Sequence, residues 1–170
     1  MRHPHVMGIA ALINREDALA ELLKEPFVAE PGRITDPAAM ETFVLAGNAT
    51  FTLRGKAVRY TYRVRKSEDG KVHFVSVLAG PDNESDYVYV GRLRNGEFAL
   101  TAKSKLGEDS GPVRAFRWFW IALRRRSAAH LAQLEFWHEA RCCRCGRKLT
   151  VPGSVASGIG PECAKMMEAA

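Results

Sequence analysis

Val-Arg-Tyr-Thr-Tyr-Arg-Val-Arg, residues 58–65, alternates apolar or aromatic side chains with arginine and threonine. Successive side chains of a β-strand point to opposite faces, so this period of two predicts a strand with one buried face and one basic face. The same alternation extends to both sides of the stretch, and it decides the fold class of the chain.

Similar short segments occur at residues 49–53, 72–78, 87–90 and 98–101. Polar turns separate them: residues 67–70 are Ser-Glu-Asp-Gly, and Asn95-Gly96 is the strongest hairpin signal in the chain. Five strands joined by short turns predict an antiparallel β-meander.

Helical patterns flank the meander. Asp36-Pro37 has the residues of an N-cap and a first helical position, and Gly47 is placed to end that helix. A second helix is expected from Pro112 to about residue 127, with four apolar residues at helical spacing that should pack on the sheet: Phe116, Phe119, Trp120 and Leu123. A further helix is expected from an N-cap at Asn14 to about Glu25. The predicted fold class is therefore α+β.

All four cysteines lie within the last 29 residues of the 170-residue chain. Cys142 and Cys145 form a C-x-x-C pair directly followed by Gly146, the form of a zinc knuckle. Cys163 follows Gly160-Pro161 and should lie in the first turn of a final helix, where the helix dipole favours a thiolate. A knuckle with a ligand on a helix N-terminus predicts a treble-clef-like module.

One structural Zn²⁺ is expected in this module, held by Cys142, Cys145 and Cys163. His138 is our predicted fourth ligand, and Cys143 or a donor from elsewhere is the alternative. A disulfide is the competing interpretation of the cysteines. The run His138-Glu139 lacks the H-x-E spacing of zinc deaminases, and no proline precedes Cys142, which favours a structural site over a catalytic one.

Three parts are expected along the chain: an N-terminal helix and linker (1–35), an α+β core domain (36–130) and a zinc-binding module (131–170). No apolar run is long enough to cross a bilayer, and the apolar stretch after Met1 is too short for a signal peptide. We therefore expect a cytoplasmic protein with reduced thiols and no membrane partner.

The net charge of +6 is confined to the C-terminal third, since residues 112–170 contain 10 Lys/Arg and 4 Asp/Glu. This asymmetry predicts a polyanionic partner, and the alternative is a basic face that only keeps the module soluble. The residues expected to contact nucleic acid or another partner are Arg124, Arg125, Arg126, Arg141, Arg144, Arg147 and Lys148, with Arg59, Arg63 and Arg65 on the basic face of the strand described above.

Two further features have competing interpretations. The basic strand face can follow a phosphate backbone, or it can be the solvated side of a sheet whose tyrosines and valines are buried. The loop at residues 80–86 collects Asp82, Glu84 and Asp86 and can bind a metal or act as an acid/base site, but Asx hydrogen bonds within a turn explain the same residues.

The string Cys142-x-x-Cys145-Gly-Arg-x-Leu-Thr-x-Pro-x-Ser-x-x-x-Gly-Ile-Gly-Pro-x-Cys163 resembles a C-terminal element of small proteins from bacteriophages and bacterial mobile elements. That element belongs to a domain family of unknown function. The resemblance covers about residues 136–165, with weaker similarity at residues 77–91 and 115–119. It implies a bacterial or phage cytoplasmic protein and brings no established activity.

The expected function is that of a phage or mobile-element type accessory protein, which binds nucleic acid through its basic C-terminal surface; an enzyme is the least expected class, because the sequence has no G-x-S-x-G, P-loop or H-E-x-x-H signature. The alternative is a protein-directed inhibitor or adaptor, for example a phage antagonist that blocks a host defence complex. In that case the arginines compete for an acidic surface of a host protein complex.

Overall fold

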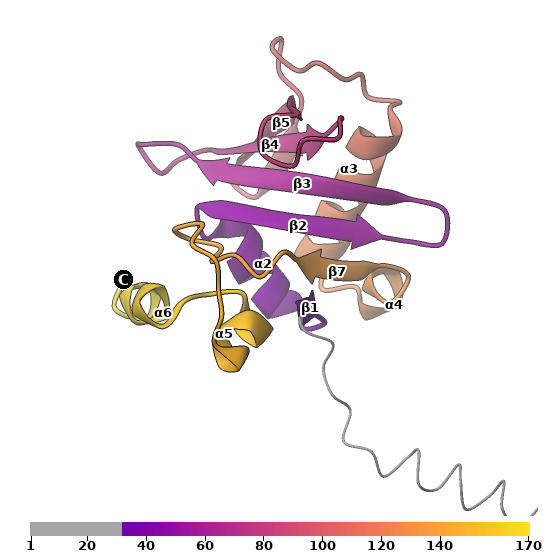
Figure 1. The fold of residues 1–170 in the computed structure, drawn as a ribbon. Helices are drawn as coiled ribbons and strands as arrows, with labels where there is room; N and C mark the ends of the chain where they lie inside the picture. Colours follow the sequence, from indigo (N-terminus) through magenta and orange to yellow (C-terminus); the bar gives the residue numbers. More distant parts are fainter. Residues whose placement is uncertain (1–31) are drawn as a thin grey trace, which may run out of the picture. The chain divides into compact units, whose positions relative to one another are not determined.

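The computed structural model describes residues 32–170, and its centre is the predicted meander (Figure 1). The five strands are β2 (Asn48–Arg54), β3 (Arg59–Lys66), β4 (His73–Leu78), β5 (Tyr87–Arg94) and β6 (Glu97–Ala99), each antiparallel to the next. Asn95 and Gly96 both have positive φ, which is the geometry of a tight hairpin turn. The helix predicted from Asn14 to about Glu25 lies outside the described residues.

Two further strands extend the sheet beyond β2. Strand β7 (Glu135–His138) pairs with β2 on one side and with the short strand β1 (Arg33–Ile34) on the other. The order is thus β1-β7-β2-β3-β4-β5-β6, and the strand just before the cysteines lies inside the sheet. The α+β prediction is confirmed, with a sheet of seven strands instead of about five.

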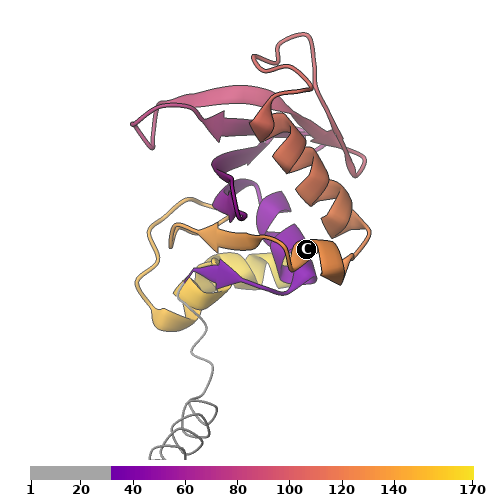
Figure 2. The same cartoon turned by 90° about the vertical axis from the view of Figure 1, so that its right-hand side faces the viewer.

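Helices α2 (Pro37–Leu45) and α3 (Gly111–Arg124) cover one face of the sheet. They lie behind the strands in Figure 1, and α3 lies to their right in Figure 2. The carboxylate of Asp36 accepts a hydrogen bond from the Ala39 amide at 2.7 Å, so this residue caps α2 as predicted. Short helices α4 (Ala128–Leu131), α5 (Pro152–Ser157) and α6 (Pro161–Glu168) follow.

Aromatic rings from both layers make the core. The ring of Phe51 on β2 stacks on that of Phe136 on β7, with ring centroids 4.6 Å apart, and both contact Phe119 of α3. Phe43 of α2 meets Phe136 edge to face at 5.6 Å. Four elements that are far apart in the sequence therefore share one aromatic cluster, which fixes β7 beside β2.

The opposite face of the sheet, here called the open face, has no helix of residues 32–170 over it (Figure 1). Its residues follow from the register. Asn48, Arg65, Phe74 and Arg92 make one row across β2 to β5, because each is the paired residue of the next. Thr50, Arg63, Ser76 and Tyr89 make the neighbouring row.

None of the helices in the described part of the chain has the length and apolar character needed to cross a membrane.

Candidate metal centre and basic surface

The knuckle is built by a tight turn at residues 142–146. The amide of Gly146 donates to the carbonyl of Cys142 at 2.8 Å, and Gly146 has a φ of +75°. A Cβ at this glycine would lie 2.7 Å from the side-chain nitrogen of Asn48, so both conformation and space require glycine here. The turn directs the thiols of Cys142 and Cys145 to the same side.

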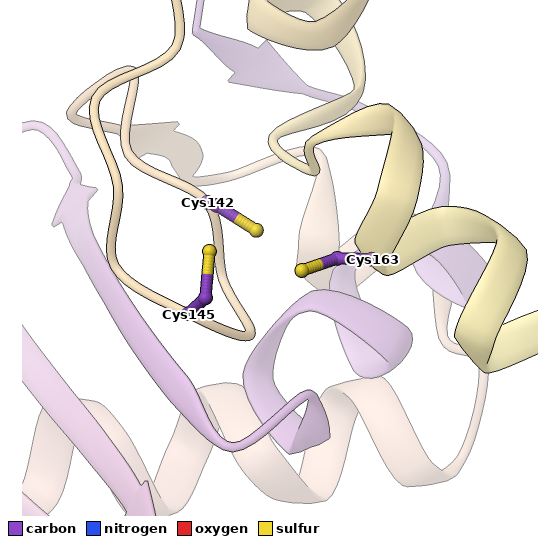
Figure 3. A group of neighbouring side chains, drawn as sticks. All are labelled: Cys142, Cys145 and Cys163. Atoms are coloured by element: carbon purple, nitrogen blue, oxygen red, sulfur yellow. The ribbon is translucent and has the colours of Figure 1, made fainter.

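Helix α6 supplies the third thiol. Cys163 is the third residue of this helix, in its first turn as predicted, and its side chain points toward the knuckle (Figure 3). The three sulfur atoms all lie within 4.8 Å of one another. Three thiols at this separation fit around a single metal ion, and no other group of three ligand side chains was found in residues 32–170.

The thiols influence each other's ionisation. Burial opposes ionisation of Cys142, but the amides of Gly160, Cys145 and Arg144 donate to its sulfur and lower its pKa to about 7. Burial and the neighbouring sulfurs of Cys145 and Cys142 raise the pKa of Cys163 to about 11. Thiolates packed together without a cation between them repel one another, and this repulsion opposes the lowering of the pKa of Cys163 that we expect from the helix N-terminus.

His138, the predicted fourth ligand, lies outside this group. It is the last residue of β7, only 6% exposed, and its ring packs on Phe43 at 5.4 Å between centroids. Its Nδ1 accepts a hydrogen bond from the Ala140 amide at 3.0 Å. Burial lowers the pKa of His138, and the backbone of Val155 opposes this shift only in part, which favours the neutral ring.

Cys143, the alternative ligand, belongs to the hydrophobic core. Its side chain is 3% exposed and burial raises its pKa to about 12, so it is a neutral thiol. Its backbone joins the knuckle to the rest of the protein: its carbonyl accepts from the Asn48 amide at 2.7 Å and its amide donates to the Gly158 carbonyl at 3.0 Å. The cysteine centre is thereby fixed to the end of β2.

The ten basic residues predicted to contact a partner divide into two groups. Three have partners inside the fold. Arg124 and Arg126 both form ion pairs with Glu41 of α2, which is only 13% exposed. Arg63 donates to the backbone carbonyls of Asn83 and Glu84, each at 3.0 Å, and its guanidinium lies 3.7 Å from the ring centroid of Tyr87. These three arginines support helix packing and a loop, and less of their charge is available to a ligand.

The loop held by Arg63 is the acidic segment at residues 80–86. Asp82 accepts from the amides of Glu84 and Ser85, and Asp86 accepts from the amide of Asp82. These contacts lower the pKa of Asp82. The interpretation of this loop as a turn with Asx hydrogen bonds is confirmed, and its acids are used to shape it.

The other seven are Arg59, Arg65, Arg125, Arg141, Arg144, Arg147 and Lys148. All seven are exposed, as Arg124 and Arg126 also are, and Arg141 has a partner in the fold too, the exposed Glu84. The structure joins two of them. A polar pocket of about 380 Å³ lies between the open face and the knuckle, with Arg65 and Arg63 on one wall and Arg141 on the other. An ion pair between Arg141 and Glu84 at 3.7 Å closes one side. Sequence reasoning missed three further lining residues, Asn48, Thr50 and Glu139, although the alternation of β2 places the first two on the open face. With Glu84, Glu139 puts two carboxylates beside the three arginines of the pocket.

A larger groove lies at the other end of the sheet. Its volume is about 1210 Å³, and its lining includes the apolar or aromatic side chains of Leu53, Val58, Tyr60, Trp118 and Leu134. Four basic residues and one acid also line it: Arg33, Arg54, Lys56, Arg114 and Glu135. No sequence signal marked this groove, because it is assembled from the β2–β3 turn, α3 and the segment before β7.

Comparison with known proteins gives one result. Residues 132–167 match the model of a family of unknown function (DUF6011). The match overlaps Cys142, Cys145 and Cys163, in agreement with the resemblance of the C-terminal element to a family of unknown function. Neither a curated protein nor a solved structure shows significant similarity to the chain.

Proposed function

We propose that this protein binds single-stranded nucleic acid on its open face and knuckle, and that a zinc ion on Cys142, Cys145 and Cys163 organises the knuckle. The role is non-catalytic. The resemblance of the C-terminal element to small phage and mobile-element proteins suggests an accessory protein of that type. The observation that carries the proposal is the polar pocket, because arginines from the sheet and from the knuckle line it together.

Zinc is the metal that the donor set favours. Three thiolates are soft ligands and select zinc over magnesium or calcium, which prefer oxygen. The short helices of the module have little core of their own, since neither α5 nor α6 contains a fully buried residue. A bound ion would stabilise this region by an amount of order 10 kcal/mol at neutral pH.

Single strands are favoured by aromatic side chains among the cations. Phe74 is 44% exposed on the open face, and Arg65 and Arg92 are its paired residues on the two neighbouring strands. The ring of Tyr89 lies 6.3 Å away. An exposed ring between two guanidinium groups suits a base flanked by phosphates, and every base can stack on it regardless of sequence.

The test is the salt dependence of binding to a fluorescent single-stranded oligonucleotide. Removing one phosphate contact should reduce the slope of log K against log salt by about 0.7. Arg65→Gln and Arg141→Gln should each show this reduction. Arg126→Gln is the matched control. Its partner Glu41 is only 13% exposed, whereas the partner of Arg141, Glu84, is 83% exposed and holds its arginine weakly, so loss of Arg126 should leave the slope unchanged.

Equal slopes for wild type, Arg65→Gln and Arg141→Gln would contradict the nucleic-acid proposal. Unfolding temperatures of all three variants show whether a loss of binding comes from loss of structure. Zinc is tested separately, by metal analysis of the purified protein.

A protein-directed adaptor is the second candidate, and the larger groove favours it. The groove combines an apolar floor with a net positive lining of four cations and one acid, whose carboxylate lies 3.8 Å from Arg54. Charge complementarity indicates an acidic segment that carries an apolar anchor residue. Under this proposal Lys56→Glu and Trp118→Ala would abolish recovery of one dominant host protein, while nucleic-acid binding would be weak.

A further inference from the structure

The polar pocket between the open face and the knuckle contains charges of both signs, which phosphate contacts alone do not explain. Three arginines and two glutamates line it, so the cations exceed the acids by only one. Two of the arginines have contacts within the fold: Arg63 donates to backbone carbonyls of the acidic loop, and Arg141 pairs with Glu84. Phosphates suit the arginines, whereas the carboxylates require hydrogen-bond donors in the same ligand.

Arg65 and Glu139 are the remaining base and acid of the pocket. Arg65 lies on β3, and Glu139 is the first residue after β7. Both are exposed, and within residues 32–170 neither forms a side-chain hydrogen bond or an ion pair, not even with the other. Two opposite charges that line one pocket of about 380 Å³ and do not meet leave room for a group between them. That group must donate to the carboxylate and accept from the guanidinium.

Guanine is the base that meets both requirements. Its Watson–Crick edge carries two adjacent donors, N1–H and N2–H, which match the two oxygens of a carboxylate. Its Hoogsteen edge carries two adjacent acceptors, O6 and N7, which match the fork of a guanidinium. No other base has both pairs. The pocket volume is near the lower end of the range for ligand sites, which suits a single nucleotide.

We propose that this pocket binds one guanine base of the single strand, with Glu139 accepting from N1–H and N2–H and Arg65 donating to O6 and N7. The inference rests on the proposed nucleic-acid binding and adds a base preference at one position of the strand. Asn48 and Thr50 line the same pocket and supply further polar groups for the base or its sugar. Phe74 follows Arg65 in the row across the open face, so a neighbouring base can stack there while the guanine is held.

Base analogues in a fluorescent oligothymidine strand test this inference on the wild-type protein. The strands differ at a single central position, which holds guanine, thymine, the base of inosine or 7-deazaguanine. The guanine strand should bind about tenfold more tightly than the all-thymine strand. The base of inosine lacks the N2 amino group and 7-deazaguanine lacks N7, so each should lose most of this difference.

Glu139→Gln shows whether the preference arises in the pocket. The amide offers one acceptor oxygen where the carboxylate offers two, so the guanine and thymine strands should bind this variant alike. Glu97→Gln is the matched control. It makes the same change of charge at an exposed residue of β6 that does not line the pocket, and it should keep the wild-type preference for guanine.

Three results would overturn the inference while nucleic-acid binding stands: equal affinity for all four strands, an inosine strand that binds as tightly as the guanine strand, or a guanine preference that Glu139→Gln retains. Failure of every strand to bind the wild-type protein would instead refute the proposed function.

Discussion

Gly158→Ala should be one of the most damaging single-methyl changes in this protein. Gly158 ends α5 with a φ of +72°, a conformation in which an alanine is strained by about 1–2 kcal/mol. It is also in close contact with the core: an added Cβ would lie 2.5 Å from the Phe43 ring and 3.3 Å from that of His138. Moving a packed ring costs a further 1–3 kcal/mol or so.

The sum is a loss of about 2–5 kcal/mol, a large part of the 5–15 kcal/mol that a domain of ordinary stability has. Gly153→Ala is the matched control within the same helix. Its φ is not positive and nothing lies within 4 Å of the added methyl group, so this change should be neutral or stabilise by up to about 1 kcal/mol.

The assay is urea unfolding of both zinc-loaded variants and the wild type, followed by tryptophan fluorescence. The urea concentration at the unfolding midpoint should be lower for Gly158→Ala than for the wild type, while the slope of the free energy of unfolding against urea concentration should stay the same. For Gly153→Ala the midpoint should be unchanged or higher. If Gly158→Ala unfolds within 0.5 kcal/mol or so of Gly153→Ala, the contact between the α5 terminus and Phe43 is not as described, and the attachment of the cysteine module to the core must be reconsidered.

Three other changes have expected outcomes. Asp36→Ala removes the cap of α2 and should lower the free energy of unfolding by about 1 kcal/mol, as measured by urea titration, whereas Asp36→Asn should retain most of it. Burial lowers the pKa of His73 more than its contact with the Leu45 carbonyl raises it, so the unfolded chain binds a proton more readily than the folded one. The free energy of unfolding should therefore be constant above the unfolded pKa of about 6.5 and fall as the pH drops below it. Thermal melts of His73→Gln should show a weaker dependence of the unfolding temperature on pH. Phe74→Ala should weaken oligonucleotide binding by about 1–3 kcal/mol and leave the slope of log K against log salt unchanged. A changed slope would contradict a stacking role for Phe74, because stacking on a base does not depend on salt as a phosphate contact does.

Local features were predictable because their causes lie within a few residues. The turn at Asn95-Gly96, the cap at Asp36 and the position of Cys163 in the first turn of α6 were each correct. Each depends on side-chain and backbone chemistry that a short window of sequence contains. The pairing of the Cys142 and Cys145 thiols followed from the C-x-x-C spacing in the same way, whereas Cys163 was added because Gly160-Pro161 predicted a helix start.

Features that depend on contacts between distant residues were not predictable. Nothing in the sequence of residues 135–138 indicates that this segment pairs with β1 and β2. The ion pairs of Glu41 with Arg124 and Arg126 join residues that lie more than 80 positions apart in the sequence. Because of these pairs, two of the three consecutive arginines at the end of α3 already have an acidic partner. The hydrogen bond that Nδ1 of His138 accepts from the Ala140 amide depends on the path of the backbone two residues later.

The place of β7 has a consequence for biosynthesis. The nascent polypeptide makes β2 through β6 in order, but the outer edge of β2 acquires its neighbour only when residues 135–138 leave the ribosome. Until then that strand edge offers unpaired amides and carbonyls to any other polypeptide nearby. A chain that ends before residue 135 would therefore keep this edge open to association with other polypeptides, and the sheet can close only after residue 138 has been made.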